Sequence, residues 1–598
     1  MPFQPPGLPV AKPRRAFQGI LYSRTLPFLL ISNLLMMLTK YAFSLLFLLL
    51  FGCREPDLLE RGLVTEQAMV VSAHPLASAV GTEILRRGGN AADAAVATEF
   101  ALAVVYPDAG NIGGGGFLVL RFADGTTDAL DYRETAPAAA HRDMYLGRRG
   151  EVQEELSLKG HLAAGVPGTV DGMMRLHDRY GTLPWAELLQ PAIELAERGF
   201  PLTRKEAKKL NQYHKDFVRY NTRRPEFVLR GRWRTGDTLR LPELAHTLRL
   251  IRDKGRAGFY EGETAENIVA EMERGGGIIT KEDLLNYKAL WRTPLTGHYK
   301  DYTIIAMPPP SSGGISLLQL LTISEQYPLA EWGWHTAQTA HLMIEAERRV
   351  YADRSRHLGD PDFWEVPVEG LLSREYILER MGNVDLEKAS SSDAIYAGEP
   401  QFSESPNTTH YSIVDAQGNA VSATTTLNST FGSLVFVDGS GFLLNNQMDD
   451  FSAKPGVPNQ YGLLGEDANA IAPGKRMLSS MTPTILEKDG KLFMVVGSMG
   501  GSTIITTVYQ IILNVVEHDL SMQGAVSAGR YHHQWKPDVV LSEWNSYNSG
   551  TYFPLLFKGH TLVPRFGTIG RAAAILVLPD GRLEGGADPR GDDAADGF

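Results

Sequence analysis

The stretch that most constrains this chain is residues 407–427, because it predicts two paired strands that begin at a threonine. The alternating residues 410–415 and the Val- and Thr-rich run 420–427 are typical of strands, and turn-forming residues lie between them. A cut between Asn407 and Thr408 would give Thr408 a free α-amine beside its own hydroxyl. Such an amine can take the hydroxyl proton, directly or through a water, and so activate a nucleophile. Taken alone, the stretch also fits a Thr-rich edge strand without chemistry, because motifs this short are not specific.

Composition is that of a globular protein with a net negative charge. The 598 residues are 43% hydrophobic and 21% charged, which allows a sizeable buried core. A formal net charge of -11 argues against a general nucleic-acid-binding protein, which normally has a basic face. The single cysteine, Cys53, excludes an internal disulfide framework and a cysteine-based metal cluster. His410 and the pair His532–His533 lack metal-ligand spacing, and we interpret them as structural.

The N-terminal segment predicts export. Residues 41–52 form an apolar run behind Lys40 that is short for a bilayer span and has the length of a signal-peptide core. Its ending at Cys53 resembles a bacterial lipobox, in which the cysteine is lipidated and becomes the mature N-terminus. We therefore expect residues 1–53 to be an export signal of lipoprotein type, and the protein to be periplasmic or attached to the membrane through Cys53. An uncleaved N-terminal anchor is the alternative, and it also exports the rest of the chain.

Periodicity and turn signals predict the elements that precede the first possible site. Residues 90–105 form an Ala-rich buried helix, and residues 117–122 and 127–132 form a hairpin. Between helix and hairpin lie four glycines, residues 113–116. They lack the ending and the spacing of phosphate-binding loops. We expect them to let backbones approach closely beside a site.

Two further predictions concern a charged helix and the C-terminal part. Residues 336–351 form a helix whose solvated face carries Glu345, Glu347, Arg348 and Arg349. Residues 539–583 form short strands. The chain is expected to be mostly helical with loops over residues 137–349 and rich in strands after residue 408.

Seven motifs follow one another along the chain, at residues 110–117, 131–134, 308–314, 407–415, 444–451, 478–481 and 497–502. In that order they resemble the motifs of the bacterial γ-glutamyltransferases, also called glutathione hydrolases. The resemblance extends from about residue 69 to the C-terminus and favours a catalytic Thr408 over an inert strand. It implies the fold of the N-terminal nucleophile hydrolases, an α+β four-layer αββα sandwich formed by two fragments of one precursor.

The resemblance implies that the precursor cuts itself before Thr408, which leaves residues 54–407 as a large subunit and residues 408–598 as a small one. The Thr408 hydroxyl would attack the Asn407 carbonyl, and water would open the resulting ester to free the α-amine. The implied partners are the two subunits of one precursor and small molecules: glutathione, other γ-glutamyl compounds, and amino acid or peptide acceptors. The resemblance implies no metal and no organic cofactor.

The resemblance also assigns residues to the γ-glutamyl head group, which carries an α-carboxylate and an α-ammonium. Arg133 matches the carboxylate-binding arginine, and a guanidinium can hold a carboxylate through two parallel hydrogen bonds. Ser479 and Ser480 match a pair that holds the same carboxylate. The group that holds the ammonium matches Asp450, Gln447 and Asn428.

The remaining assignments surround the reacting carbon. Gly500 and Gly501 match an oxyanion hole formed by two backbone N–H groups. Thr426 matches a second threonine that supports the nucleophile. Tyr461, in the loop of residues 453–473, matches a lid over the glutamyl pocket.

Residues and resemblance together predict transfer of a γ-glutamyl group from glutathione to water, amino acids or peptides through an ester on Thr408. One alternative on the same fold is an acylase for a glutaryl side chain, of the cephalosporin acylase type. Arg133 and Asp450 argue against it, because this pair recognises an amino acid head group. The other alternative is an inactive surface lipoprotein that uses the fold for binding. The intact nucleophile and oxyanion glycines argue against that function.

Overall fold

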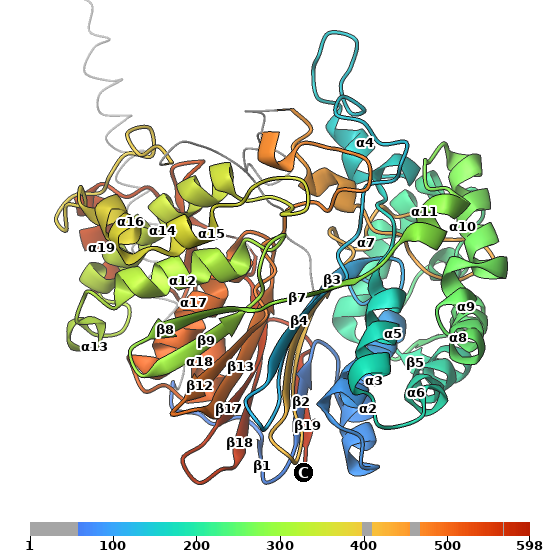
Figure 1. Cartoon of the computed structure of the whole chain (residues 1–598), viewed down its shortest axis with the longest axis horizontal. Helices are drawn as coiled ribbons and strands as arrows, with labels where there is room; N and C mark the ends of the chain where they lie inside the picture. Colours follow the sequence, from blue (N-terminus) through green and yellow to red (C-terminus); the bar gives the residue numbers. More distant parts are fainter. Residues whose placement is uncertain (1–57, 398–408, 455–466, 566) are drawn as a thin grey trace, which may run out of the picture. The chain divides into compact units, whose positions relative to one another are not determined.

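Figure 1 shows a computed structural model of the chain, which describes residues 58–397, 409–454, 467–565 and 567–598. The predictions for four residues lie outside this part: Cys53, Asn407, Thr408 and Tyr461. Within the described residues, no helix is both long enough and apolar enough to cross a bilayer.

Two seven-stranded antiparallel sheets form the centre. The first has the order β19, β2, β10, β11, β3, β4 and β7, with bounds Ala594–Gly597, Met69–Ser72, Thr409–Val414, Ala420–Thr426, Gly115–Arg121, Thr127–Asp131 and Leu290–Arg292. The second has the order β1, β18, β17, β13, β12, β9 and β8, with bounds Val64–Thr65, Leu583–Ala587, Arg571–Val577, Lys491–Met499, Thr484–Lys488, Tyr302–Ala306 and Leu295–Tyr299. Smaller sheets are β14 (Tyr531–His532), β15 (Val540–Ser542) and β16 (Leu562–Pro564), and β5 (Phe200–Pro201) with β6 (Thr238–Leu239).

Both hairpins that the sequence predicts in the first sheet are confirmed. β10 pairs with β11 so that Thr409 lies opposite Thr425, and β3 pairs with β4. Asp415 closes the first turn by accepting hydrogen bonds from the backbone N–H groups of Gln417 and Asn419, both at 2.9 Å. Every residue of β10 and β11 is buried, because one face of the hairpin meets the second sheet and the other meets a helix.

The two sheets face each other across β10, β11 and β13, and polar groups cross the interface. The hydroxyl of Ser412 donates to the carbonyl of Ala573 at 3.0 Å, and that of Ser422 donates to the carbonyl of Val496 at 3.1 Å. A Cβ atom at Gly497 would lie only 2.2 Å from the ring of His410, so a glycine is needed where the strands approach.

Helices cover both outer faces of the sheet pair, which confirms the predicted αββα sandwich (Figure 1). On the first sheet and beyond it lie α2 (Pro75–Arg86), α3 (Ala91–Val105), α5 (Thr169–Tyr180), α6 (Trp185–Arg198), α7 (Arg204–Tyr220), α8 (Pro242–Lys254), α9 (Ala257–Tyr260), α10 (Gly262–Gly275) and α11 (Lys281–Asn286). On the second sheet and beyond it lie α12 (Gly313–Ser324), α13 (Leu329–Trp332), α14 (Ala337–His357), α15 (Val368–Leu372), α16 (Arg374–Met381), α17 (Thr503–Val516), α18 (Met522–Ser527) and α19 (Ser549–Lys558). The helix predicted at residues 90–105 is α3, and all its residues are buried.

Two predictions about other elements are wrong. The charged face of α14 is not solvated: Glu345, Glu347, Arg348 and Arg349 are all buried. Glu345 and Arg349 form an ion pair at 2.7 Å, and Arg349 also donates to Asn383 at 2.6 Å. Residues 539–583 contain strands, as expected, but also the helix α19. A short helix of aromatic and apolar residues has little polar periodicity, so its sequence resembles a strand.

Candidate active site

The run of four glycines at residues 113–116 lies against β11. A Cβ atom at Gly114 would lie 2.1 Å from the carbonyl oxygen of Thr426, and one at Gly116 would lie 2.4 Å from that of Thr424. β3 and β11 therefore approach more closely than side chains would allow. The predicted close approach of the backbones is confirmed, and Thr426 lines the pocket described next.

Eight of the predicted site residues line one pocket at the end of β11. Its free volume is only about 10 Å³, close to the minimum that holds a single water. Two residues that were not predicted as site residues, Met481 and Ile504, complete the wall. The predicted members are Arg133, Thr426, Asn428, Gln447, Asp450, Ser479, Ser480 and Gly501.

An ion pair between Arg133 and Asp450 occupies this pocket. A terminal guanidinium nitrogen of Arg133 lies 2.5 Å from a carboxylate oxygen of Asp450, and both side chains are buried. Arg133 follows β4 directly and is held by the carbonyls of Met477 at 3.2 Å and Leu478 at 3.1 Å. A zwitterionic head group entering the pocket would exchange this one ion pair for two, so charge balance would be kept.

Burial sets the protonation of the pocket's carboxyl groups. It raises the pKa of Asp450, and the guanidinium of Arg133 opposes that shift. Burial also raises the pKa of Glu134 to about 8, although Arg133 lies 3.8 Å away and lowers it. At neutral pH, Glu134 is therefore mostly uncharged, and Asp450 supplies the negative charge that faces Arg133.

Two amide side chains stand beside the ion pair. Asn428 has a φ of 73°, a left-handed conformation that asparagine tolerates better than most residues. Its backbone N–H donates to the hydroxyl of Thr426 at 2.8 Å, which orients that hydroxyl. Gln447 is fully buried, and its side-chain amide has no hydrogen-bond partner among the described residues. Buried amides rarely stay unsatisfied, so Gln447 is suited to bind a polar ligand.

Ser479 and Ser480 form hydrogen bonds with residues that are distant in the sequence. Ser479 donates its backbone N–H to the carbonyl of Pro310 at 3.0 Å. The hydroxyl of Ser480 accepts from the guanidinium of Arg354 at 3.1 Å, and Arg354 also donates to Ser312 at 2.8 Å. Arg354 is buried on α14 and was not predicted as a site residue from the sequence. The one available signal was the dense run of charges on that helix.

Gly500 and Gly501 lie in the turn between β13 and α17. Their φ angles are 134° and 62°, values that side-chain-bearing residues rarely adopt. A Cβ atom at Gly500 would lie 2.8 Å from the Cα atom of Gly570. The pair directly precedes the N-terminus of α17, a 14-residue helix. The first backbone N–H groups of a helix lack partners within the helix and favour negative charge.

The predicted nucleophile lies outside the described residues. Thr408 and Asn407 both belong to the undescribed stretch, and β10 begins at the next residue, Thr409. Thr409 pairs with Thr425, the neighbour of Thr426. The strand that follows the predicted cut thus begins level with the residues that line the pocket.

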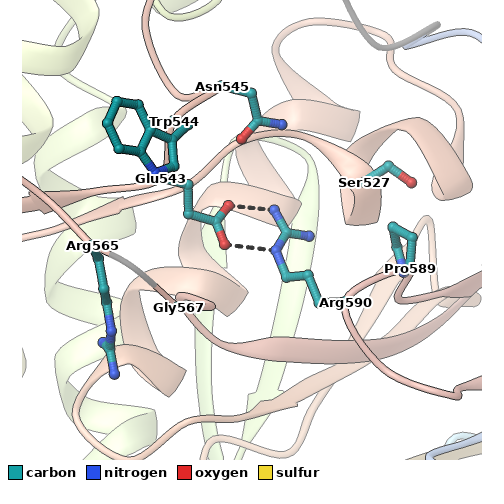
Figure 2. Close-up of a pocket in the computed structure, with 8 residues that line it drawn as sticks. All are labelled: Ser527, Glu543, Trp544, Asn545, Arg565, Gly567, Pro589 and Arg590. Atoms are coloured by element: carbon teal, nitrogen blue, oxygen red, sulfur yellow. Dashed lines mark hydrogen bonds and ion pairs between the residues drawn. The ribbon is translucent and has the colours of Figure 1, made fainter. Parts of the chain in front are cut away.

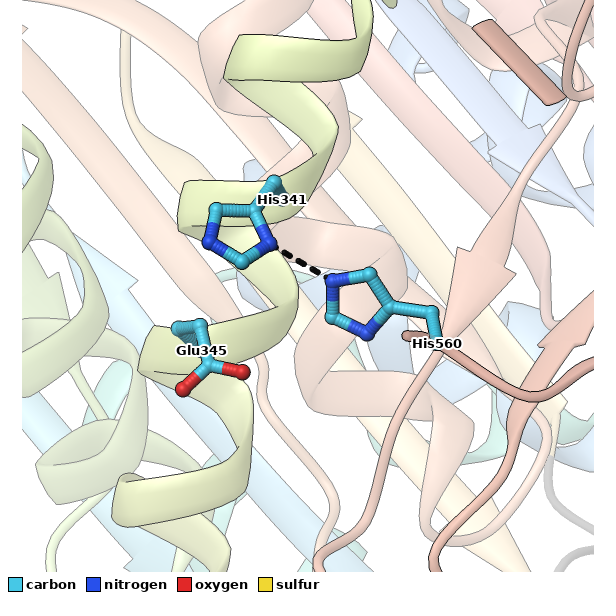
Figure 3. A group of neighbouring side chains, drawn as sticks. All are labelled: His341, Glu345 and His560. Atoms are coloured by element: carbon cyan, nitrogen blue, oxygen red, sulfur yellow. Dashed lines mark hydrogen bonds between the residues drawn. The ribbon is translucent and has the colours of Figure 1, made fainter. Parts of the chain in front are cut away.

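A second cluster, His341, Glu345 and His560, has the composition of a metal site (Figure 3). Its possible ligand atoms all lie within 4.8 Å of one another. The two imidazoles are already joined by a hydrogen bond of 2.7 Å. Burial alone would raise the pKa of Glu345, but Arg348 and Arg349 lower it to about 2. A cation would have to compete with two guanidinium groups for this carboxylate, so the cluster is better described as a hydrogen-bond network that joins α14 to the end of α19.

Comparison with known proteins identifies the family. A family model described as gamma-glutamyltranspeptidase matches residues 77–598. The glutathione hydrolase proenzyme of Escherichia coli (strain K12) is 47% identical over 536 residues, which cover 89% of this chain and 92% of that protein. The cephalosporin acylase of Bacillus halodurans is 30% identical and superimposes with a TM-score of 0.81 over 90% of this chain and 97% of that one.

A solved γ-glutamyltranspeptidase from Helicobacter pylori is 42% identical, with a TM-score of 0.54, and the match covers 57% of this chain and 97% of that one. The family match extends over nearly all of the chain outside its N-terminal segment. It agrees with the sandwich fold and with the residues gathered in the pocket. The chain belongs to the γ-glutamyltranspeptidase family.

Proposed function

We propose that the protein is a γ-glutamyltransferase and glutathione hydrolase that matures by cutting its own chain before Thr408. The observation that carries the proposal is the buried pair Arg133 and Asp450, opposite charges 2.5 Å apart in a pocket that Gly501 also lines. An arginine suits the α-carboxylate of a γ-glutamyl group, and an aspartate suits its α-ammonium. The serine pair and Gln447 offer further hydrogen bonds to the same head group.

The Thr408 hydroxyl that acts in catalysis also performs the maturation cut. The Thr408 hydroxyl attacks the carbonyl of Asn407, the peptide C–N bond breaks, and the Asn407 acyl group becomes an ester on Thr408. Water then hydrolyses that ester. The products are a carboxylate on Asn407 and a free α-amine on Thr408, so residues 54–407 and 408–598 become separate subunits of one enzyme.

In the mature enzyme, the α-amine of Thr408 takes the proton of its own hydroxyl while the oxygen attacks the γ-carbonyl of the donor. The N–H groups of Gly500 and Gly501 stabilise the oxyanion that forms. The amide C–N bond then breaks, the leaving amine takes the proton, and a γ-glutamyl ester remains on Thr408. Water or the amine of an acceptor opens that ester. Tyr461 would cover the pocket during these steps, as the lid of the predicted loop.

A glutaryl acylase is the rival on this fold, since one structural relative is a cephalosporin acylase. A glutaryl group has the terminal carboxylate but lacks the ammonium. In this pocket it would pair with Arg133 and leave the carboxylate of Asp450 buried without a cation, which is costly. The pocket therefore favours γ-glutamyl donors.

The proposal is tested by Thr408→Ala. The wild-type chain should run as two fragments on a denaturing gel, and the variant should run as a single precursor that releases no glutamate from glutathione. Loss of the hydroxyl removes both the attack on Asn407 and the acyl ester. A variant that still splits into the same two fragments would refute the mechanism.

Asp450→Asn tests whether Asp450 binds the α-ammonium of the γ-glutamyl group. Loss of the carboxylate should raise the KM for a γ-glutamyl anilide by about 10- to 100-fold, the range expected for a charge-assisted hydrogen bond. A glutaryl anilide should be affected far less. In the wild type, the KM for the γ-glutamyl anilide should rise as the pH falls through the raised pKa of Asp450, because protonation removes the charge that holds the ammonium. Equal effects on both anilides would contradict the assignment.

Gly500→Ala tests the oxyanion hole. The new methyl group would lie 2.6 Å from the hydroxyl of Thr503 and 2.8 Å from Gly570, so the turn must shift. Displacing one donor should lower kcat by about 10²- to 10³-fold. Gly490→Ala is the matched control, since Gly490 has a φ of 71° but no heavy atom within 4 Å of an added Cβ. An equal loss in both variants would assign the effect to backbone strain alone.

We also propose that the protein is exported and that Cys53 carries the lipid of its mature N-terminus. The support is the predicted signal of residues 1–53. Mass spectrometry of the mature protein should find an N-terminal Cys53 with attached acyl chains, and Cys53→Ala should abolish labelling by a fatty acid. A mature N-terminus elsewhere, without lipid, would exclude this mode of attachment while leaving the catalytic proposal unaffected.

A further inference from the structure

The two oxyanion glycines face different cavities. Gly501 lines the small head-group pocket, whereas Gly500 lines a second cavity of about 580 Å³. This second cavity is bounded by the loop after α3, the first turns of α7, the residues around Gly570 and the C-terminal residues 590–592. The Cα atoms of consecutive residues are about 3.8 Å apart. A substrate carbonyl bound by the N–H groups of both glycines would therefore lie where the two cavities meet. One cavity takes the acyl side of the scissile amide, and the other is open to the amine side.

The second cavity is rich in positive charge. Six basic side chains line it, against three acidic ones. Four of the six basic groups are already paired: Lys205 with Asp592, Lys209 with Asp108, Arg571 with Asp593, and Arg590 with Glu543. The basic lining residues are Lys205, Lys208, Lys209, Arg565, Arg571 and Arg590, and the acidic ones are Asp108, Glu206 and Asp592.

Arg565 is different from its paired neighbours. Its guanidinium has neither a hydrogen-bond partner nor a carboxylate within 4.0 Å in the described part of the chain, although the residue is half-buried. Glu543, whose charge acts on Arg565, is held by Arg590 through two contacts of 2.7 and 2.5 Å. Figure 2 is a close-up of another pocket that Arg565 and Arg590 also line, and it shows this closed pair with Arg565 pointing away from it. Burial lowers the pKa of Arg565, and Glu543 only partly offsets that effect. A partly desolvated guanidinium without an acceptor is suited to bind an external anion.

We propose that Arg565 binds the carboxylate at the far end of the amine-side substrate. Resting on the proposed function, this inference assigns the second cavity to the cysteinylglycine part of glutathione and, after it leaves, to an amino acid or dipeptide acceptor. A cavity of about 580 Å³ is in the size range of small-molecule sites. The guanidinium can hold a carboxylate through two parallel hydrogen bonds. Lys208, an exposed residue that also lines the cavity, adds positive charge.

Donor and acceptor must share this site for a chemical reason. The acceptor amine attacks the ester from the position that the leaving amine has vacated, because both occupy the same side of the acyl carbon. A carboxylate attached one or two residues beyond that amine therefore meets the same cation in both half-reactions. The preferred acceptors are then amino acids and short peptides with a free C-terminal carboxylate.

Arg565→Gln tests the proposal with three donors: glutathione, glutathione whose glycine carboxylate is converted to a carboxamide, and a γ-glutamyl anilide. We expect the KM for glutathione to rise about tenfold with kcat within about twofold, as for loss of a uniform binding contact. The carboxamide and the anilide should be unaffected, and the anilide also reports that the variant is folded and processed. In transfer from the anilide, the KM for glycylglycine should rise about tenfold and that for glycylglycine amide should not change.

Arg582→Gln is the matched control. Arg582 is an exposed arginine in the turn between β17 and β18, paired with Asp580 at 2.7 Å, and it lines neither cavity. Its loss changes the net charge equally and should leave all five substrates unaffected. The proposal is overturned if Arg565→Gln has no effect on glutathione, or weakens the carboxamide and the anilide as much. A wild-type enzyme inactive on every donor would instead overturn the proposed function itself.

Discussion

The contact between β10 and β13 determines where everything else in the site can lie. Gly497 leaves room for the ring of His410, which is buried and hydrogen-bonds Thr424 at 2.9 Å. Burial lowers the pKa of His410 to about 3, so the ring is neutral and can be packed between the sheets. With the strands fixed at this crossing, the start of β10 and the glycine turn after β13 are set relative to each other. The strand that follows the proposed nucleophile and the turn proposed as the oxyanion hole therefore belong to one interface between two sheets.

Charges in the head-group pocket are balanced before any substrate arrives. A buried ion pair such as Arg133 with Asp450 contributes little net stability, because desolvation of both groups offsets their attraction. In the proposed function its value is preorganisation: the arginine is held by the carbonyls of Met477 and Leu478, so a γ-glutamyl head group would meet groups that are already aligned. The neutral Glu134 beside them keeps a second negative charge out of the pocket.

Much of this arrangement could be predicted from the sequence, because the informative signals are local. Alternation and turn residues identify the β10–β11 hairpin, and an unbroken alanine-rich run identifies α3. The charges of α14 could not be placed in the same way. A helix with Glu345 and Arg349 one turn apart has the pattern of a solvated face, yet the partners that bury these groups, such as Asn383 and Ser390, lie well away along the chain. Arg354 was missed for the same reason, since its partners Ser312 and Ser480 are brought to it only by folding.

The strand order has a consequence for how such an enzyme can be made. β2, which precedes Thr408 in the chain, lies between β10 and β19, which both follow it. In the other sheet, β12 follows Thr408 and its neighbour β9 precedes it. Neither piece of a chain cut at that bond contains a complete sheet. If the chain is cut there, as we propose, the continuous chain must fold first and be cut second. The two pieces would then remain interleaved without a covalent link, and their separation would require unfolding of both sheets.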